Sequence, residues 1–237
     1  GITFFYPPLE EQERIVAKLD AAFAEIDEAI EAANKNIKSI RNLFDTELMA
    51  QFKNLKSSSK IISIADACED IFAGGDAPKV AFSKFKTEEY NIPIFANAAK
   101  QKGLYGFTDI PRVNVPAVTI AGRGSGTGYT EIRMEPFLPI VRLIVLLPKP
   151  EIVSIEFLKK AILSLDVLSS GSAIPQLTVP MIKTYKIPVP TLNEQKNLIK
   201  KLDEIEVNVS MLAHNYVEKI SNYNALKSAI LAQELQS

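Results

Sequence analysis

Cysteine and histidine are almost absent from this sequence. Its 237 residues include one cysteine, Cys68, and one histidine, His214. A lone cysteine cannot form a disulfide bond within the chain, which is typical of proteins of a reducing compartment such as the cytoplasm. Structural zinc sites use four cysteine or histidine ligands, so the sequence does not predict one. We expect a cytoplasmic protein without a metal.

Long hydrophobic runs are also missing. The longest, Ile140–Leu147, contains Arg142 and is followed by Pro148, whereas a membrane-spanning helix needs about 20 apolar residues. This run predicts a buried strand instead. The first residues do not have the pattern of a signal peptide. The composition, with 47% hydrophobic and 23% charged residues, is ordinary for a globular protein, and we expect no membrane partner.

The sequence also lacks the motifs of known catalytic sites. We find no arrangement of Ser, His and Asp for nucleophilic catalysis, no metal-binding cluster and no pair of carboxylates with suggestive spacing. The Asn-Pro-Pro-[Tyr/Phe] stretch of amino-methyltransferases is not present either. Cys68 has no basic or histidine neighbour in the sequence that would activate its thiol. The sequence therefore predicts a protein that is not an enzyme.

One glycine-rich stretch is present, Gly122-Arg-Gly-Ser-Gly-Thr-Gly128. A dinucleotide-binding loop would be followed at once by a helix, and a P-loop would end in Lys-Ser or Lys-Thr, but here the strand-like residues 129–133 follow. We therefore favour a tight hairpin, in which glycine supplies positive φ. Two forms of it remain open: a plain hairpin, and one whose glycines let the backbone approach DNA phosphates.

The net charge of −1 hides an uneven distribution. Between Asn54 and Pro190 there are 16 Lys and Arg against 12 Asp and Glu, a local charge of +4, and the rest of the chain has 11 against 16, a charge of −5. The middle of the chain is mildly basic and its flanks are acidic. This distribution allows a nucleic-acid-binding surface in the middle without demonstrating one.

A stretch that occurs twice organises the chain. Residues 7–20 (PPLEEQERIVAKLD) align without a gap with residues 190–203 (PTLNEQKNLIKKLD), at an offset of 183 residues. Among the identical positions, Leu9, Glu11, Gln12, Lys18, Leu19 and Asp20 recur as Leu192, Glu194, Gln195, Lys201, Leu202 and Asp203. An unrelated segment separates the copies, so the pattern is not that of a solenoid. It indicates two equivalent arms on either side of a different domain.

Each copy opens a long helical pattern, and we predict helices over residues 10–53 and 191–237. Apolar residues recur with alternating spacings of three and four, as in a heptad seam. The second seam is interrupted at Glu206 and Lys227. Because the arms flank one domain, an antiparallel coiled coil is expected. The predicted seam residues are Val16, Leu19, Phe23, Ile26, Ile30, Ala33, Ile37, Ile40 and Phe44, and then Ile199, Leu202, Val209, Ala213, Tyr216, Ile220, Tyr223 and Ile230.

Residues 54–190 have many short strand-like runs and turns and few helical ones. We expect strands over residues 91–97, 115–120, 140–147 and 182–189, and a helix over 154–168 that ends at Gly171. Residues 1–9 read as a remnant strand and lead-in that corresponds to residues 185–189. The fold class predicted is α+β: a mixed α/β domain built on a curled sheet, flanked by two long helices.

Polar side chains in the middle domain are candidates for DNA contacts. Asn and Gln can bind adenine through two hydrogen bonds, whereas Lys and Arg bind guanine or phosphate. Any one of these residues, taken alone, fits a solvated polar loop equally well. The residues that we predict to contact DNA are Lys79, Asn97, Lys100, Gln101, Arg123, Ser125, Thr127, Tyr129 and Gln176.

At the repeated Pro-x-Leu-x-Glu-Gln stretches, and at Gly171-Ser-Ala-Ile-Pro-Gln176, the chain resembles the specificity subunit of prokaryotic type I restriction-modification systems. The resemblance covers essentially the whole chain, as helix, target-recognition domain (54–190) and helix. It implies that the domain reads one half of a split DNA sequence. The helices would fix the spacing of the two halves and dock methyltransferase subunits. Those subunits would carry S-adenosylmethionine, so that this chain binds no cofactor, and a restriction subunit would join them.

The chain departs from the family pattern, which has two recognition domains, in having one. It is therefore either the second half of a full subunit or a half-length subunit, and the latter would dimerise about a two-fold axis to read a symmetric interrupted site. A competing interpretation is a coiled-coil scaffold whose central domain binds protein. A specificity subunit of a fused or other methylation system is a further variant.

Overall fold

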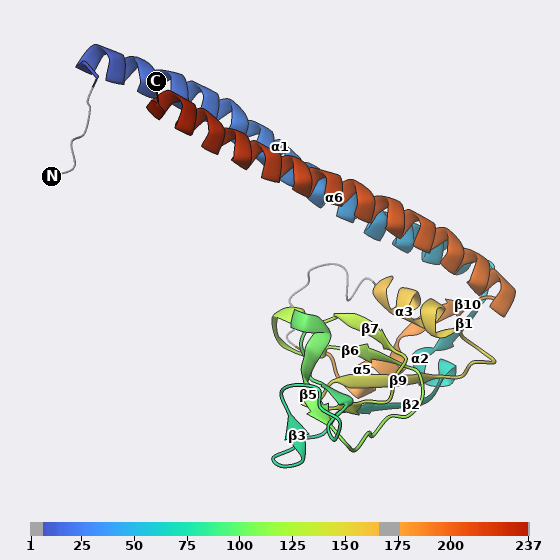
Figure 1. The fold of residues 1–237 in the computed structure, drawn as a ribbon. Coiled ribbons are helices and arrows are strands. Elements are labelled where there is room, and N and C mark those ends of the chain that lie inside the picture. The colour runs from blue at the N-terminus through green and yellow to red at the C-terminus, as the bar shows by residue number, and fades with distance from the viewer. Residues whose placement is uncertain (1–6, 166–175, 237) are drawn as a thin grey trace. The chain divides into compact units, whose positions relative to one another are not determined.

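The computed structural model describes residues 7–165 and 176–236, and the chain divides into two units that are treated separately below (Figure 1). The helical unit comprises Gly1–Phe44 and Glu204–Ser237, and the recognition unit comprises Asp45–Asp203. The recognition unit thus starts at Asp45 and includes the last turns of the first helix, whereas the boundary was predicted at residue 54. The reason is that Leu48 and Phe52 are buried there.

Both long helices form as predicted. They are α1 (Leu9–Leu55) and α6 (Leu192–Gln236), and within the helical unit they lie side by side (Figure 1). Lys18 near the start of α1 forms an ion pair with Glu234 near the end of α6. Further along, Lys227 Nζ lies 2.5 Å from Asp27 Oδ1. This order of contacts confirms the antiparallel coiled coil.

The seam of α1 follows the prediction except at its first position. Ile26 and Ala33 are buried, and the residues between Leu19 and Phe44 at the other predicted positions are partly buried. Val16 was predicted wrongly, because 55% of its surface is exposed. Its neighbour Ile15 is partly buried instead. The three-four pattern accommodates either residue at this point, and the helix rotation set by the later positions selects Ile15.

The seam of α6 is more continuous than predicted. Ile205 is partly buried, so it fills the position at which Glu206 was expected to interrupt the pattern. Lys227 does interrupt it, and its Nζ lies 5.1 Å from the centroid of the Phe23 ring. A polar residue in a seam position typically fixes the register of a coiled coil at some cost in stability.

The described residues of the recognition unit form three sheets rather than one curled sheet. The α+β class is confirmed. All neighbouring strands are antiparallel except β4 and β8, which are parallel. The sheets are β1 (Lys60–Ser63) with β10 (Lys186–Val189); a large sheet in the order β2 (Cys68–Ala73), β9 (Ile144–Pro148), β6 (Ala117–Ile120), β7 (Thr130–Arg133); and a small sheet in the order β3 (Phe82–Ser83), β5 (Leu104–Thr108), β4 (Ile92–Phe95), β8 (Leu138–Pro139).

Helix α3 (Ile155–Leu163) forms much of the core of this unit. The Ser154 hydroxyl accepts a hydrogen bond from the Phe157 N–H and so caps the helix. The Phe157 ring is buried, with its centroid 5.2 Å from that of Phe52 on α1. The end predicted for this helix, including Gly171, lies outside the described residues. The short helix α2 (Ile64–Ala67) joins β1 to β2.

One strand prediction was partly wrong. Residues 182–189 were expected to form a single strand, but α5 (Val179–Thr184) occupies the first part and β10 only the rest. Thr178 caps α5 by accepting the Met181 N–H, and Pro180 stands in its first turn, where proline is well tolerated. These two start signals outweigh the apolar pattern that favoured a strand.

The glutamine of the repeated stretch anchors α6 to the recognition unit. Gln195 is fully buried. Its Oε1 accepts the Ser154 N–H (2.9 Å), and its Nε2 donates to the carbonyls of Ile152 (2.9 Å) and Pro190 (3.0 Å). In the first copy, Gln12 donates to the Pro7 carbonyl (2.7 Å) in the same way. The two copies therefore share a local hydrogen bond, and among the described residues Gln195 makes two further ones, to Ser154 and Ile152 of the recognition unit.

Candidate nucleic-acid interface

Two loops from different sheets meet at Asn97. This residue follows β4 of the small sheet, and the glycine-rich loop follows β6 of the large sheet. Asn97 Oδ1 accepts the Gly122 N–H (2.5 Å), and Asn97 Nδ2 donates to the Arg123 carbonyl (3.1 Å). Both the oxygen and the nitrogen of the Asn97 amide thus form hydrogen bonds with the backbone of the glycine-rich loop. Its role as a base contact stays a prediction, and the structure gives it a role in holding two loops together.

Arg133 connects the same two sheets. Only 7% of its surface is exposed, and burial lowers the pKa of its guanidinium. Its Nη2 donates to the Lys102 carbonyl (2.5 Å), and its Nε donates to Thr119 Oγ1 (3.2 Å). The guanidinium carbon also lies 3.6 Å from the centroid of the Phe95 ring. A buried arginine of this kind acts as a brace between the loop after β4 and the strands of the large sheet.

The loop that Arg133 holds has an uncommon backbone. Gln101 and Lys102 have φ values of 50° and 54°, in the left-handed region that costs a non-glycine residue on the order of 1–2 kcal/mol. They belong to the 3₁₀ turn η1 (Lys100–Gly103). The side chains of Lys100, Gln101 and Lys102 are all exposed at its tip. The Arg133 hydrogen bond therefore fixes a strained turn that presents three polar side chains to solvent.

The glycine-rich stretch forms the predicted hairpin between β6 and β7. Gly124 and Gly128 have φ values of 77° and 88°, which only glycine adopts without strain. Thr127 donates its hydroxyl to the Gly124 carbonyl (2.7 Å), and Tyr129 donates to Glu131 Oε2 (2.6 Å). Burial and this carboxylate raise the pKa of Tyr129 to about 12. Both hydroxyls remain available as acceptors, and the Ser125 side chain lies outside the described residues.

Arg123 and Gln176 meet at a cleft beside this hairpin. The two residues pair as an isolated bridge, and the Leu177 N–H donates to the Gly122 carbonyl (2.7 Å). The cleft has a volume of about 220 Å³. It is also lined by Arg142, which was expected within a buried strand but is exposed. This strand, β9, starts at Ile144, because a turn at residues 141–142 precedes it.

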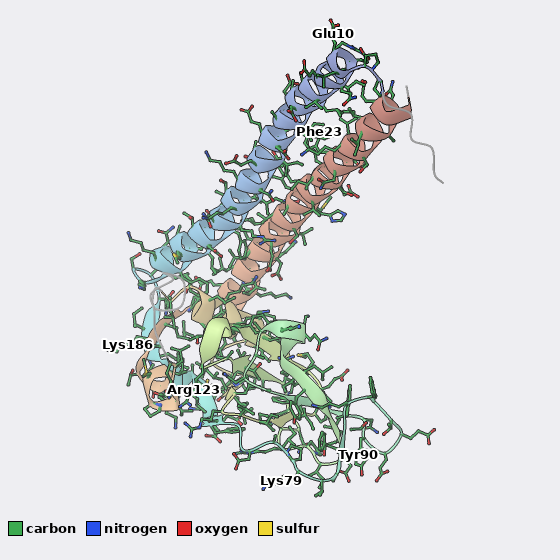
Figure 2. The ribbon with its side chains drawn as sticks, turned by 90° about the vertical axis from the view of Figure 1, so that its left-hand side faces the viewer. Glu10, Phe23, Lys79, Tyr90, Arg123 and Lys186 are labelled. Atoms are coloured by element: carbon green, nitrogen blue, oxygen red, sulfur yellow. The ribbon has the colours of Figure 1, made fainter. Side chains whose placement is uncertain are left out.

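Lys79 is the predicted residue that the structure does not bring to this surface. Figure 2 shows Lys79 and Arg123 well apart within the recognition unit. Lys79 precedes β3, and the nearby Ala81 carbonyl accepts the Thr108 hydroxyl at the end of β5. The tip at Lys100–Lys102 lies at the opposite end of β5, which starts at Leu104. A DNA contact by Lys79 stays a prediction, separate from the others.

The connected loops form one surface, which we call the recognition surface. It contains seven of the nine predicted residues, and Lys102, Arg133 and Arg142 were not predicted as site residues. Arg142 stands inside an apolar run that predicted a buried strand, and Arg133 stands at the end of a strand-like stretch that was read only as part of the hairpin. The recognition surface consists of Asn97, Lys100, Gln101, Lys102, Arg123, Thr127, Tyr129, Arg142 and Gln176.

The described residues offer little for other chemistry. Within them, no group of three or more His, Cys, Asp or Glu is placed to hold a metal ion. Burial raises the pKa of the Cys68 thiol to about 12, which disfavours the reactive thiolate. None of the described helices combines the length and apolar character that a membrane crossing requires.

Comparisons with known proteins agree on one family. The family model described as "Type I restriction modification DNA specificity domain" matches residues 56–228. Two putative type I specificity subunits of Mycoplasma pneumoniae, S.MpnORF89P and S.MpnORF507P, are 31% and 29% identical over 211 and 204 residues. These alignments cover 84% and 86% of the chain, and 62% and 55% of the relatives. The chain thus spans less than two thirds of the relatives that it matches.

Solved structures show the same fold. A chain from a study of complex assembly and conformational transition of the type I R-M system gives a TM-score of 0.80 at 23% identity, and the match covers 97% of this chain and 60% of that one. The HsdS subunit from Thermoanaerobacter tengcongensis gives 0.63, also at 23% identity, covering 98% and 59%. At these identities the likeness concerns the fold alone.

Proposed function

This chain belongs to the family of type I restriction-modification DNA specificity domains, and we propose that it reads one half of a bipartite sequence in duplex DNA. The observation that carries the proposal is the recognition surface. Side chains from two sheets are joined there by Asn97 and Arg133, so that exposed cations and amides face the same partner. Sequence recognition in DNA needs such a fixed set of donors and acceptors.

Different parts of the surface suit different parts of the duplex. The Gln101 amide at the tip of η1 has the donor and acceptor pair that binds adenine in the major groove, and Lys100 or Lys102 can bind guanine or phosphate. The hydroxyls of Thr127 and Tyr129 accept from exocyclic amines while they donate within the hairpin. The chain itself carries out no catalysis and binds no cofactor in this role.

The first test is the salt dependence of binding to duplex DNA. Lys100, Lys102, Arg123 and Arg142 can neutralise up to four phosphates, so the logarithm of the binding constant should fall with the logarithm of salt concentration with a slope of up to about −3.6. Fluorescence anisotropy with a labelled duplex measures this slope. A slope near zero, or the absence of DNA binding, would favour the competing protein-binding scaffold.

The helices provide the second part of the proposal. An antiparallel pair leaves its outer faces uncovered, and several apolar side chains of α6 are exposed there, among them Val207, Met211 and Val217. We infer that these faces dock methyltransferase subunits, which supply S-adenosylmethionine and are joined by a restriction subunit. We place the assembled complex in the prokaryotic cytoplasm. A second copy of the chain, related by a two-fold axis, would read the other half of the DNA site.

Light scattering tests this assembly. The chain has a mass of 26.2 kDa, and we expect twice this mass for the chain alone and a further gain of two methyltransferase subunits when these are added. The substitution Met211→Asp should prevent that gain and leave DNA binding intact, because it places a charge on an apolar helix face. A strict monomer that never binds the methyltransferase would contradict both the homodimer and the docking role.

A further inference from the structure

The cleft beside the hairpin brings together two arginines that have no partner in the part of the chain that the structure describes. Arg123 and Arg142 line it together, and neither guanidinium forms a hydrogen bond or ion pair within residues 7–165 and 176–236. Both side chains are exposed. Two like charges that share one cleft repel each other unless an anion lies between them. The arrangement therefore predicts an anionic ligand.

Arg142 is presented to the cleft by a strained turn. Val141 and Arg142 have φ values of 50° and 60°, as in the two-residue turns where asparagine and glycine are preferred. The Leu143 N–H donates to the Ile140 carbonyl (3.1 Å) and closes the turn. A β-branched residue at positive φ is a clear outlier, and such outliers gather at functional sites.

The surrounding backbone holds this turn in place. The Val141 N–H donates to the Gly75 carbonyl (2.6 Å), and the Arg142 N–H donates to the Gly74 carbonyl (3.1 Å). The Gly74 N–H in turn donates to the Leu143 carbonyl (2.8 Å). Three hydrogen bonds between the two segments thus maintain a conformation that the sequence at positions 141–142 disfavours. The strained turn places the Arg142 side chain at the cleft.

We propose that Arg123 and Arg142 together bind one backbone phosphate of duplex DNA. The guanidinium group presents paired N–H donors that match two phosphate oxygens. Ile144, Leu177 and Val179 also line the cleft, and none of them carries a charge that would compete with a phosphate for the two arginines. Its volume of about 220 Å³ is below the range of small-molecule sites, so it suits a single phosphate group.

The position of the cleft favours DNA over a free phosphate ion as the source of this group. Arg123 is tied through its carbonyl to Asn97, three residues before Lys100 at the tip of η1. A polyanion such as DNA can contact both the cations of this tip and those of the cleft, whereas a free phosphate ion contacts one of them only. This inference rests on the proposed function, because it names the part of the duplex that the cleft contacts and adds Arg142 to the residues that position the DNA.

The test replaces Arg142 by asparagine, which tolerates the left-handed conformation and carries no charge. We expect DNA affinity to fall about tenfold, to a similar extent for cognate and unrelated duplexes, and the salt slope to become shallower by about 0.9. The melting temperature should rise, because the strain is relieved. A residue with only a structural role would not combine higher stability with weaker DNA binding.

The control is Lys149→Asn, which removes the same charge just beyond the other end of β9, seven residues along the chain or roughly 20 Å at about 3.3 Å per residue; Lys149 Nζ donates there to the Asp66 carbonyl (3.1 Å). It should leave the salt slope unchanged. If Arg142→Asn also leaves the slope unchanged while the wild-type protein binds DNA with a steep slope, the phosphate site is refuted and the proposed function stands. If the wild-type protein does not bind duplex DNA, the proposed function itself fails.

Inorganic phosphate distinguishes the two sources of the ligand. We expect it to raise the melting temperature of the wild-type protein only at concentrations well above those at which duplex DNA does so. If inorganic phosphate stabilises the wild-type protein but not Arg142→Asn, while the DNA salt slope is the same in both, the cleft binds the free anion. That result would overturn its assignment to the DNA backbone.

Discussion

The substitution Gln195→Ala is expected to destabilise the recognition unit by about 3 kcal/mol. The side chain is fully buried and satisfies the Ser154 N–H and the carbonyls of Ile152 and Pro190. Each buried polar group left without a partner costs about 1–3 kcal/mol, and water that enters the space of the lost amide recovers part of this. In a domain of this size such a loss lowers the melting temperature by about 10 °C.

The repeat supplies the matched control for this prediction. Gln12 occupies the equivalent position in the first copy and makes one of the three hydrogen bonds, to the Pro7 carbonyl. Since Gln12 is only partly buried, Gln12→Ala should cost less than about 1 kcal/mol. Differential scanning calorimetry of both variants measures the difference. Equal losses at the two positions would show that Gln195 does not anchor α6 to the recognition unit.

The substitution Arg133→Met is expected to reduce sequence discrimination by about 100-fold at the DNA positions that Gln101 and Lys102 read, with little change in stability. Methionine fills a similar space, and removing the desolvated charge of Arg133 offsets much of the cost of losing its two hydrogen bonds. Without the hydrogen bond to the Lys102 carbonyl, the left-handed turn at Gln101 and Lys102 relaxes to other conformations. Contacts that specify bases depend on such pre-organised geometry.

Selection of binding sites from a random duplex library measures this effect and needs no assumption about the target sequence. The sequence preference of Arg133→Met should weaken at the positions that Gln101 and Lys102 read and persist elsewhere, and the salt slope should stay the same because Arg133 is buried. The variant Arg133→Lys keeps one donor for the Lys102 carbonyl and should partly restore the preference. An unchanged preference in Arg133→Met would refute the role of Arg133 as a positioning residue.

Periodicity and turn chemistry were enough to predict much of this fold. Alternating three and four spacings identified both long helices, and positive φ at glycine identified the hairpin at residues 122–128. The errors arose where two local signals competed. At residues 182–184 the apolar pattern indicated a strand, but the Thr178 cap and Pro180 started a helix. At position 16 two neighbouring apolar residues both fitted the seam.

The exposed residues of the recognition surface could be predicted from the sequence, but the residues that hold its loops in place could not. Polar residues of loops, such as Gln101 and Arg123, can be recognised as candidate DNA contacts from their chemistry alone. Arg133 cannot, because its role depends on the Lys102 carbonyl and the Phe95 ring, which come from distant parts of the chain. Arg142 was hidden for a related reason, since a left-handed turn with Val and Arg has no sequence signature.

The central claim is that the recognition surface reads a DNA sequence. Selection of binding sites from a random duplex library with the wild-type protein tests it most directly. If the recognition surface reads DNA, the protein should enrich a short defined sequence, and the enriched duplexes should compete far better than unselected ones at the same salt concentration. If no sequence is enriched while the protein remains folded and binds its partner subunits, the surface does not read DNA. The chain would then be a structural member of its complex rather than the one that specifies the site.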